Sequence, residues 1–404
     1  MKKSVFKYKL RILNDNFKKN YGENAEDVFT SPGRIELIGN HTDHNNGMVL
    51  VSSIDMMITA VCKKNEENLF VYQTNGFPKM VVNILDLEKK ENELGSSIGM
   101  IRGVLFRMKE LGYKIGGVNV STSTTIFKGA GVSSSAAFEL LICQIMNHYF
   151  NDDKIEAYEL AKIAQFSEAE YFGKPCGLLD QSGIALGGIN FIDFKNPSSP
   201  IIINIKVELS KYDVTIVNTK GNHSKLTKEY AKIKEDMFKV SSFFNKKFLR
   251  EVNEDEFYAK KEEIIKEFGE DVYLRGKHYF EENRRVIEAF EAINNKDEDT
   301  FVRKIGESGE SSFYQLKNCY VKSEEENLPK AILASKKIIK NGSCRVHGGG
   351  FAGTILAFTR KDETQKYRLE MIRMFGKNNV RGVIFNSDGT KYCGNLASIL
   401  KKSN

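Results

Sequence analysis

A glycine- and serine-rich segment is the first part of the sequence with the residue types of a binding site. It reads Lys128-Gly-Ala-Gly-Val-Ser-Ser-Ser-Ala-Ala137 and joins a predicted strand to a predicted helix. Gly129 and Gly131 allow backbone amides to approach a ligand, and the following helix points its positive end at the same place. The pattern favours phosphate binding, with the hydroxyls of Ser133–Ser135 available to phosphate oxygens or magnesium. The alternative is a serine-rich cap on a buried helix. No Gly-Lys-Ser/Thr triplet occurs, so this is not a Walker A loop.

A second cluster groups one arginine, two histidines and an aspartate after a predicted strand. It reads Pro32-Gly-Arg-Ile-Glu-Leu-Ile-Gly-Asn-His-Thr-Asp-His44. His41 and His44 lack a third nearby ligand, so the zinc interpretation is weak. Asn40 and Asp43 are suited to hydrogen-bonding a polyhydroxylated ligand. The alternative is an Asx-turn that only stabilises the loop.

Two further segments carry polar or glycine-rich patterns. Glu168 precedes Pro175-Cys-Gly-Leu-Leu-Asp-Gln-Ser182, where Asp180 follows a Pro/Gly turn, a position at which an aspartate ordinarily caps a helix. His347-Gly-Gly-Gly-Phe-Ala-Gly353 is similar to the oxyanion loop of esterases. The one G-x-S-x-G match, Gly95-Ser-Ser-Ile-Gly99, follows a polar stretch rather than a predicted strand, so it is not the strand–turn–helix nucleophile elbow that esterase chemistry requires. The glycines then indicate a tight loop packed against a ligand or another backbone.

The hydrophobic pattern predicts the elements that must position these segments. In the first half it predicts helices at 96–111, 134–149 and 156–172, and strands at 47–62, 69–73, 79–85, 117–126, 184–194 and 201–209. In the second half it predicts strands at 213–218, 354–359 and 380–385, and helices at 223–248, 254–268, 278–292, 297–314 and 328–340. A turn at Pro197–Pro200 predicts a domain junction near residues 195–210.

Composition and charge narrow the class of protein. A length of 404 residues predicts two or three domains, and 41% hydrophobic with 28% charged residues is ordinary for a folded, water-soluble chain. The net charge of +7 comes from scattered residues rather than a basic face, so nucleic-acid binding is not indicated. Six cysteines form no C-x-x-C pair, residues 1–13 lack the core of a signal peptide, and no apolar run approaches about 18 residues. We therefore expect a cytoplasmic protein without a membrane partner.

Five motifs in this order resemble the galactokinase branch of the GHMP small-molecule kinases. Gly33-Arg-Ile-Glu-Leu-Ile-Gly-Asn-His-Thr-Asp-His44 is similar to the signature G-R-x-x-L-I-G-E-H-T-D-Y. The segment 128–137 resembles the family's phosphate loop, and 347–353 resembles its third glycine motif. Cys176-Gly-Leu-Leu-Asp-Gln181 resembles C-G-x-x-D-Q, and Asn222-His-Ser with Glu229-Tyr230 resembles N-H-S…E-Y. The resemblance covers nearly the whole chain.

This resemblance implies an ATP-dependent kinase for the anomeric hydroxyl of a hexose, with galactose as the leading substrate and galactose 1-phosphate as the product. Asp180 would act as the base or orienting group, and Arg34 would lie against both Asp180 and the phosphate in transfer. Ser135, with Ser134, and Glu168 would hold Mg²⁺. The residues implied for the sugar are Asn40, His41, Asp43, Gly177 and Tyr230. The residues implied for the ATP phosphates are Gly129, Ala130, Gly131, Val132, Ser133, Ser134 and Ser135.

The resemblance also implies an α+β fold with two lobes. The N-terminal domain, residues 1–200, would resemble ribosomal protein S5, and the C-terminal domain, residues 201–404, would hold a ferredoxin-like sheet. ATP, magnesium and sugar would meet between them, as ligands commonly do at domain interfaces. The oligomeric state is left open, with a monomer favoured.

The sequence departs from the family at several positions. Asn40 replaces a glutamate, His44 a tyrosine, His347 a small or hydroxyl residue and Ala352 a glycine, and residues 307–313 have lost much of the S-H-x-S-L-R pattern. Other anomeric substrates are therefore alternatives: galactosamine, N-acetylgalactosamine, a uronic acid or a pentose. A catalytically silent sugar sensor is a further alternative, disfavoured because the serine segment, the arginine and the catalytic aspartate are complete. The region 240–285 matches the family least well.

Overall fold

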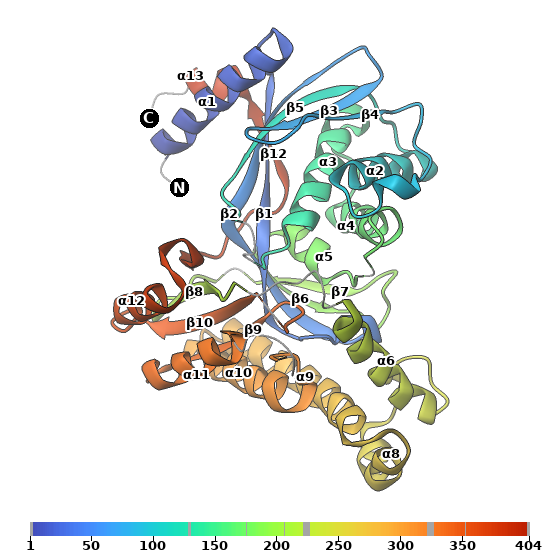
Figure 1. Cartoon of the computed structure of the whole chain (residues 1–404), viewed down its shortest axis with the longest axis vertical. Helices are drawn as coiled ribbons and strands as arrows, with labels where there is room; N and C mark the ends of the chain where they lie inside the picture. Colours follow the sequence, from blue (N-terminus) through green and yellow to red (C-terminus); the bar gives the residue numbers. More distant parts are fainter. Residues whose placement is uncertain are drawn as a thin grey trace.

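The computed structural model describes residues 3–127, 131–174, 176–205, 207–220, 227–320, 327–351 and 353–401, which form two β-sheets and the helices packed on them (Figure 1). The helices are α1 Lys3–Tyr21, α2 Ser97–Glu110, α3 Ser134–Asn151, α4 Ala157–Phe166, α5 Leu179–Leu186, α6 Thr227–Phe243, α7 Glu254–Ala259, α8 Lys261–Phe268, α9 Glu270–Asn294, α10 Glu298–Ser311, α11 Asn327–Ile338, α12 Thr364–Phe375 and α13 Leu396–Lys401. The strands are β1 Asp27–Ile38, β2 Met48–Lys64, β3 Leu69–Thr74, β4 Met80–Asn83, β5 Val118–Thr124, β6 Ile189–Asp193, β7 Ile201–Ile205, β8 Tyr212–Asn218, β9 Gly342–His347, β10 Thr354–Arg360, β11 Val380–Val383 and β12 Lys391–Asn395.

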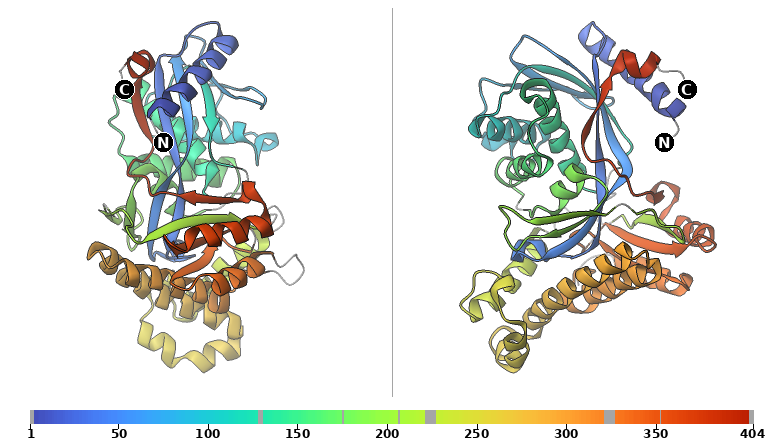
Figure 2. Two further views of the ribbon diagram at one scale, coloured as in Figure 1. Left: turned by 90° about the vertical axis from the view of Figure 1, so that its left-hand side faces the viewer. Right: turned by 180° about the vertical axis from the view of Figure 1, so that it is seen from behind.

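The larger sheet is built around the long neighbouring strands β1 and β2. Its order is β12-β1-β2-β5-β3-β4, with β6 added to the first part of β2 and β7 to β6. Helices α2 to α5 cover one face of this sheet, and α1 and α13 lie side by side on the other (Figure 2). The last strand of the chain therefore completes the first sheet, because β12 pairs with β1.

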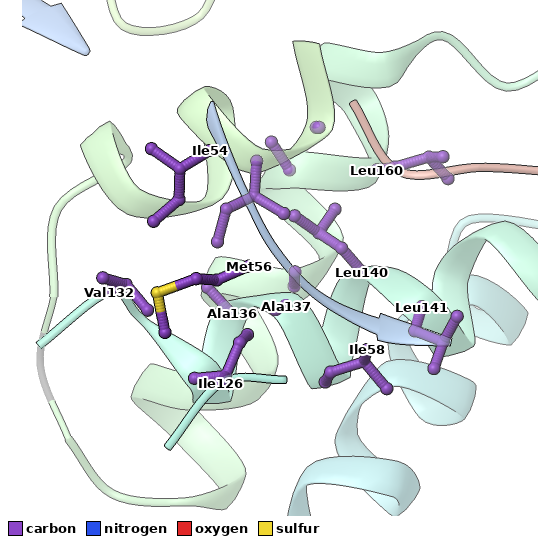
Figure 3. Close-up of a cluster of buried hydrophobic side chains, with 14 of the residues drawn as sticks. Ile54, Met56, Ile58, Ile126, Val132, Ala136, Ala137, Leu140, Leu141 and Leu160 are labelled. Atoms are coloured by element: carbon purple, nitrogen blue, oxygen red, sulfur yellow. The ribbon is translucent and has the colours of Figure 1, made fainter. Parts of the chain in front are cut away.

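The packing of β2 against α3 sets where the serine-rich segment lies. Alternate residues of a strand face the same side, and from Ile54 to Ile58 the inward-facing residues of β2 are apolar and buried (Figure 3). They belong to the same buried cluster as Ala136 and Ala137, in the first turn of α3. These small side chains allow the helix to approach the strand closely. The start of α3 is thereby anchored on the sheet, with Val132 buried just before it.

The smaller sheet has the order β11-β8-β10-β9, and all of its pairs are antiparallel. Strand β10 is buried on both faces. Ile355 and Ala357 pack in a cluster with residues of α11 and α12, whereas Leu356 and Phe358 pack with residues of α9 and α10. The sheet therefore lies between two helical layers, and the cluster on its α9–α10 side continues into the core of the larger sheet.

The predicted elements are found with one correction of type. Residues 184–186, predicted as the start of a strand, end helix α5 instead, and β6 begins at Ile189. A short helix buried on several sides has the same continuous apolar pattern as a buried strand. Gly187 and Gly188, both at positive φ, separate the two elements. Strands β9 and β12 and helices α1, α12 and α13 had no sequence prediction. The domain division at residue 200 stays a prediction; β7 and β12, from beyond it, belong to the larger sheet. None of the described helices is both long enough and apolar enough to span a membrane.

Candidate active site

An arginine from β1 and an aspartate from the start of α5 form an ion pair at the centre of the site. Arg34 Nε donates to Asp180 Oδ1 at 2.7 Å across 146 residues of sequence. The arginine is 4% exposed, and the aspartate is partly exposed. Burial alone would raise the pKa of Asp180, but the Arg34 charge and hydrogen bonds from Arg34 and Ser133 outweigh it and lower that pKa to about 2. The carboxylate is therefore firmly ionised at neutral pH.

The serine-rich segment reaches this ion pair from the start of α3. Ser133 Oγ donates to Asp180 Oδ2 at 2.5 Å, and Arg34 Nη1 donates to the carbonyl of Gly131 at 2.9 Å. Ser133 has φ 56° and ψ 57°, a left-handed conformation that is unusual for a residue with a side chain and that concentrates at functional sites. Val132 packs against Gly33: a Cβ built on residue 33 would lie 2.9 Å from Val132 Cγ2. The predicted phosphate residues Gly129 and Ala130 lie outside the described residues.

The two predicted magnesium ligands are in contact. Ser135 Oγ donates to Glu168 Oε1 at 3.0 Å, and Glu168, which is 1% exposed, lies on a π-helical turn that follows α4. Its carboxylate also accepts from Lys174 Nζ at 2.8 Å and Gln181 Nε2 at 2.7 Å. A hydroxyl and a carboxylate are the hard oxygen donors that Mg²⁺ prefers, and Lys174 already brings positive charge to the same oxygen. The predicted neighbour Ser134 is exposed.

Asp43 and Gly177 pack directly against each other. A Cβ on residue 177 would lie 1.8 Å from Asp43 Oδ2, so only glycine fits there. Burial, together with the charge of Asp180, raises the pKa of Asp43 to about 6. Asp43 also holds its own turn, because Oδ1 accepts from the backbone N–H of His44 at 2.9 Å. The charge of Asp180 acts on this carboxyl, so Asp43 lies near the ion pair. Its backbone bond is to the next residue, not to the residue two positions on that an Asx-turn requires.

His41 and Tyr230 both contact the glycine loop that follows β9. His41 Nε2 donates to the carbonyl of Gly349 at 3.0 Å, and the Tyr230 hydroxyl donates to the carbonyl of Gly350 at 3.0 Å. Burial lowers the pKa of His41 to about 4, so its ring is neutral at pH 7. Among the residues described, no group of three or more His, Cys, Asp or Glu side chains is placed to hold a metal ion. The segment 222–224 of the N-H-S motif lies outside the described residues.

Asn40 differs from the other predicted sugar residues because its amide is enclosed by protein. It is 1% exposed, and its Nδ2 donates to Glu36 Oε1 and to the carbonyl of Gly348, both at 2.8 Å. Its Oδ1 accepts from Asn318 Nδ2 at 2.7 Å and from Ser312 Oγ at 3.4 Å. An amide has two donor hydrogens and two acceptor lone pairs, so these partners use its full capacity. A contact with sugar would require one of them to be released, and this role stays a prediction.

Two residues at the site had no predicted role. Lys174 is one of them, and His347, whose Nε2 lies 3.1 Å from Arg34 Nη1, is the other. His347 is visible in the sequence only as a departure from a family motif. Its partner lies 313 residues away, a separation at which no local pattern indicates contact.

Two family models and several curated relatives match this chain. The family described as "Galactokinase galactose-binding signature" matches residues 15–64, and "GHMP kinases N terminal domain" matches residues 99–188. A galactokinase of Lactococcus lactis subsp. lactis is 30% identical over 371 residues, 89% of each chain. A galactokinase of Clostridium tetani is 28% identical over 371 residues, 90% of this chain and 92% of the relative.

Solved structures share the fold. The crystal structure of Lactococcus lactis galactokinase complexed with galactose superposes with a TM-score of 0.83 at 24% identity, covering 95% of this chain and 99% of that one. A mevalonate kinase structure gives a TM-score of 0.63 at 15% identity, covering 89% and 99%. These matches confirm the predicted two-lobed α+β fold. With the sequence relatives, they establish that this chain belongs to the galactokinase family of GHMP kinases.

Proposed function

We propose that the protein transfers the γ-phosphoryl group of ATP to the anomeric hydroxyl of galactose, giving galactose 1-phosphate and ADP. The observation that carries this proposal is the Arg34–Asp180 ion pair, which Ser133 joins from the serine-rich segment. A carboxylate, a guanidinium and a phosphate-loop hydroxyl within hydrogen-bonding distance are the groups that this transfer requires. The family relationship supports the choice of galactose.

Asp180 would orient the anomeric hydroxyl and accept its proton. In the reaction the sugar oxygen forms a bond to the γ-phosphorus while the bond from that phosphorus to the bridging oxygen of ADP breaks. A carboxylate with a pKa of about 2 is a weak base, so it accepts the proton late, after the oxygen has begun to bond to phosphorus. A loose transition state tolerates this, because little negative charge is needed on the attacking oxygen.

Arg34 would place positive charge against the group in transfer. Its Nε is used by Asp180 and its Nη1 by Gly131, while Nη2 has no acceptor among the described residues. A planar guanidinium with one free nitrogen can bind a phosphoryl oxygen without leaving the aspartate. This arrangement aligns the donor and acceptor groups and offsets the charge of the phosphate.

The phosphates of ATP would lie against the segment from Gly129 to Ser135, at the positive start of α3. Magnesium, when bound, would neutralise phosphate charge, and Ser135 with Glu168 are the residues whose oxygens fit it. The Ser135 hydroxyl and the Glu168 carboxylate already lie 3.0 Å apart. The Lys174 ammonium shares that carboxylate and is placed to exchange for the metal.

Asp43, His41, Gly177 and Tyr230 would form the sugar side of the site. Asp43 offers a carboxylate acceptor beside Gly177, whose lack of a side chain leaves room for that carboxylate. All donors and acceptors of the Asn40 amide have protein partners, so a sugar contact at residue 40 would compete with those partners. Discrimination among sugars at this position would thus differ from that of a kinase with glutamate there.

The test is a panel of sugars assayed for ADP release, with the position of the phosphate on each product determined by NMR. We expect galactose to give the highest kcat/KM and phosphate on the anomeric oxygen. A higher kcat/KM for galactosamine, N-acetylgalactosamine, a uronic acid or a pentose would replace galactose as the substrate. Binding of sugar and ATP without ADP release would identify the sugar sensor instead.

A further inference from the structure

His347, from the smaller sheet, contacts Arg34, from the larger sheet. It is the last residue of β9, is 2% exposed, and places Nε2 3.1 Å from Arg34 Nη1. The same Arg34 nitrogen donates to the carbonyl of Gly131 at 2.9 Å. A Cβ on Gly131 would lie 3.5 Å from His347 Cδ2, so the ring also packs against the phosphate segment.

The chemistry of arginine decides how this contact is made. A guanidinium has only N–H donors, and it keeps its proton in proteins. His347 Nε2 must therefore be the acceptor, which places the ring proton on Nδ1 and leaves the imidazole neutral. Burial, together with the charges of Arg34 and Arg345, lowers the pKa of His347 well below its usual range, in agreement with a neutral ring.

The unpaired Nδ1–H group indicates that a histidine at residue 347 does more than stabilise the fold. Within the described part of the chain, Nδ1 is buried and has no hydrogen-bond partner. A buried donor without an acceptor is costly, and a small or apolar side chain at this position would avoid that cost. The useful atom of the ring is therefore Nε2, on the side that faces Arg34.

We propose that His347 is a positioning residue for phosphoryl transfer: its Nε2, with the Gly131 carbonyl, holds the Arg34 guanidinium so that Nε stays on Asp180 and Nη2 is presented to the phosphoryl group. Three acceptors on two nitrogens fix both the plane and the rotation of the guanidinium. Without His347, the ion pair of Arg34 with Asp180 persists. One Nη1 hydrogen of Arg34 then loses its acceptor, and the guanidinium is held less firmly in its orientation. This inference rests on the proposed function.

Two variants separate the hydrogen bond from packing. His347→Leu removes the acceptor and keeps an apolar side chain, whereas His347→Gln places an amide oxygen near the position of Nε2. We expect His347→Leu to lower kcat for ADP release by about 10- to 100-fold, as small misplacements of catalytic groups do, with the KM for galactose within about threefold. His347→Gln should retain kcat within about threefold of the parent. Equal kcat in the parent and His347→Leu, or equal losses in both variants, would overturn the proposal.

A double-mutant cycle and a spectroscopic measurement complete the test. If His347 acts through the guanidinium, His347→Leu should lower kcat much less in an Arg34→Lys background than in the parent, and additive losses would contradict it. Long-range ¹⁵N–¹H NMR, with the His347 ring assigned by its absence in His347→Gln, should show a neutral ring protonated on Nδ1. A ring protonated on Nε2, or on both nitrogens, would overturn the geometry. The NMR result does not depend on turnover, so a parent protein inactive on every sugar would refute the proposed function separately.

Discussion

Arg34 and Asn40 lie in the same short segment of the chain and are both buried, yet their hydrogen-bonding states are opposite. Arg34 keeps one nitrogen, Nη2, without an acceptor in the described structure, while its other nitrogens hold Asp180 and Gly131. Asn40 has a protein partner for each of its donors and acceptors. The first side chain is therefore prepared for a ligand, and the second is prepared to hold the protein together.

The surroundings of Asn40 explain why its amide is enclosed. Glu36 Oε1 accepts from Asn40 Nδ2 and from Arg345 Nη2, both at 2.8 Å, inside the protein. Burial raises the pKa of Glu36 to about 7, even though Arg345 and Arg34 both favour its charged form. The protein interior therefore only just accommodates the single carboxylate of Glu36. One residue of the binding signature can therefore serve as a structural link while a neighbour in the same signature serves the reaction.

Removing the charge of Asp180 should have the largest effect on turnover. We expect Asp180→Asn to lower kcat by about 10²- to 10⁴-fold, because the amide cannot accept the proton and no longer forms an ion pair with Arg34. Asparagine keeps the size of the side chain and an Oδ1 that can accept from Arg34 Nε, so the thermal unfolding midpoint should change little. ADP release and thermal unfolding measured on the same preparation test both parts. Near-parental turnover would remove Asp180 from the mechanism.

Replacing Arg34 with lysine tests the other half of the ion pair. The ammonium keeps the charge but cannot hold Asp180 and Gly131 while presenting a third nitrogen to phosphate. We expect Arg34→Lys to lower kcat by about 10²-fold, similar to the loss of one strong donor to a transition state. The coupled ADP assay at saturating ATP measures it. An unchanged rate would show that charge alone suffices.

Asn40→Glu should instead act on stability. A glutamate at residue 40 would place a second carboxylate against Glu36, which is buried and already has a raised pKa. We expect a loss of about 3–5 kcal/mol in the free energy of unfolding, as for other uncompensated buried charges. The matched control is the double variant with Glu36→Gln, which restores a single carboxylate and should recover much of that loss in urea unfolding. A single variant as stable as the parent would show that the protein can accommodate a second carboxylate beside Glu36.

The sequence allowed the types of most elements to be predicted, together with the segments that form the site. The pairing of Arg34 with Asp180 could be expected only from the family resemblance, because no local pattern reports a contact across 146 residues. The need for glycine at residue 177 became clear only when Asp43 was found where its side chain would be. The enclosure of Asn40 was not predicted, since three of its four partners come from the second half of the chain.

The errors have a common physical origin. Residues 184–186 were predicted as strand because burial on several sides removes the periodicity that distinguishes a helix. The role of His347 was missed for a related reason: its function depends on which atom of a distant side chain it meets. Hydrophobic pattern reports burial, whereas hydrogen-bond partners depend on tertiary geometry.

Sugar binding should depend on pH through Asp43, with a smaller effect than the substitutions above. The pKa of this carboxyl is raised to about 6, so it loses its negative charge as the pH falls through 6, whereas a free aspartate would lose it near 3.9. At pH 5 about one-tenth of Asp43 is ionised, and the KM for galactose should be about tenfold higher than its value near neutral pH. The kcat should hold over the same range, because Asp180, with a pKa of about 2, stays ionised.

Asp43→Asn is the matched control: its KM for galactose should be high and independent of pH between 5 and 8, with the KM for ATP unchanged. A flat KM in the parent, or an acid limb that persists in Asp43→Asn, would assign the sugar contact to another residue and leave the ion pair as the one ligand-ready part of the signature.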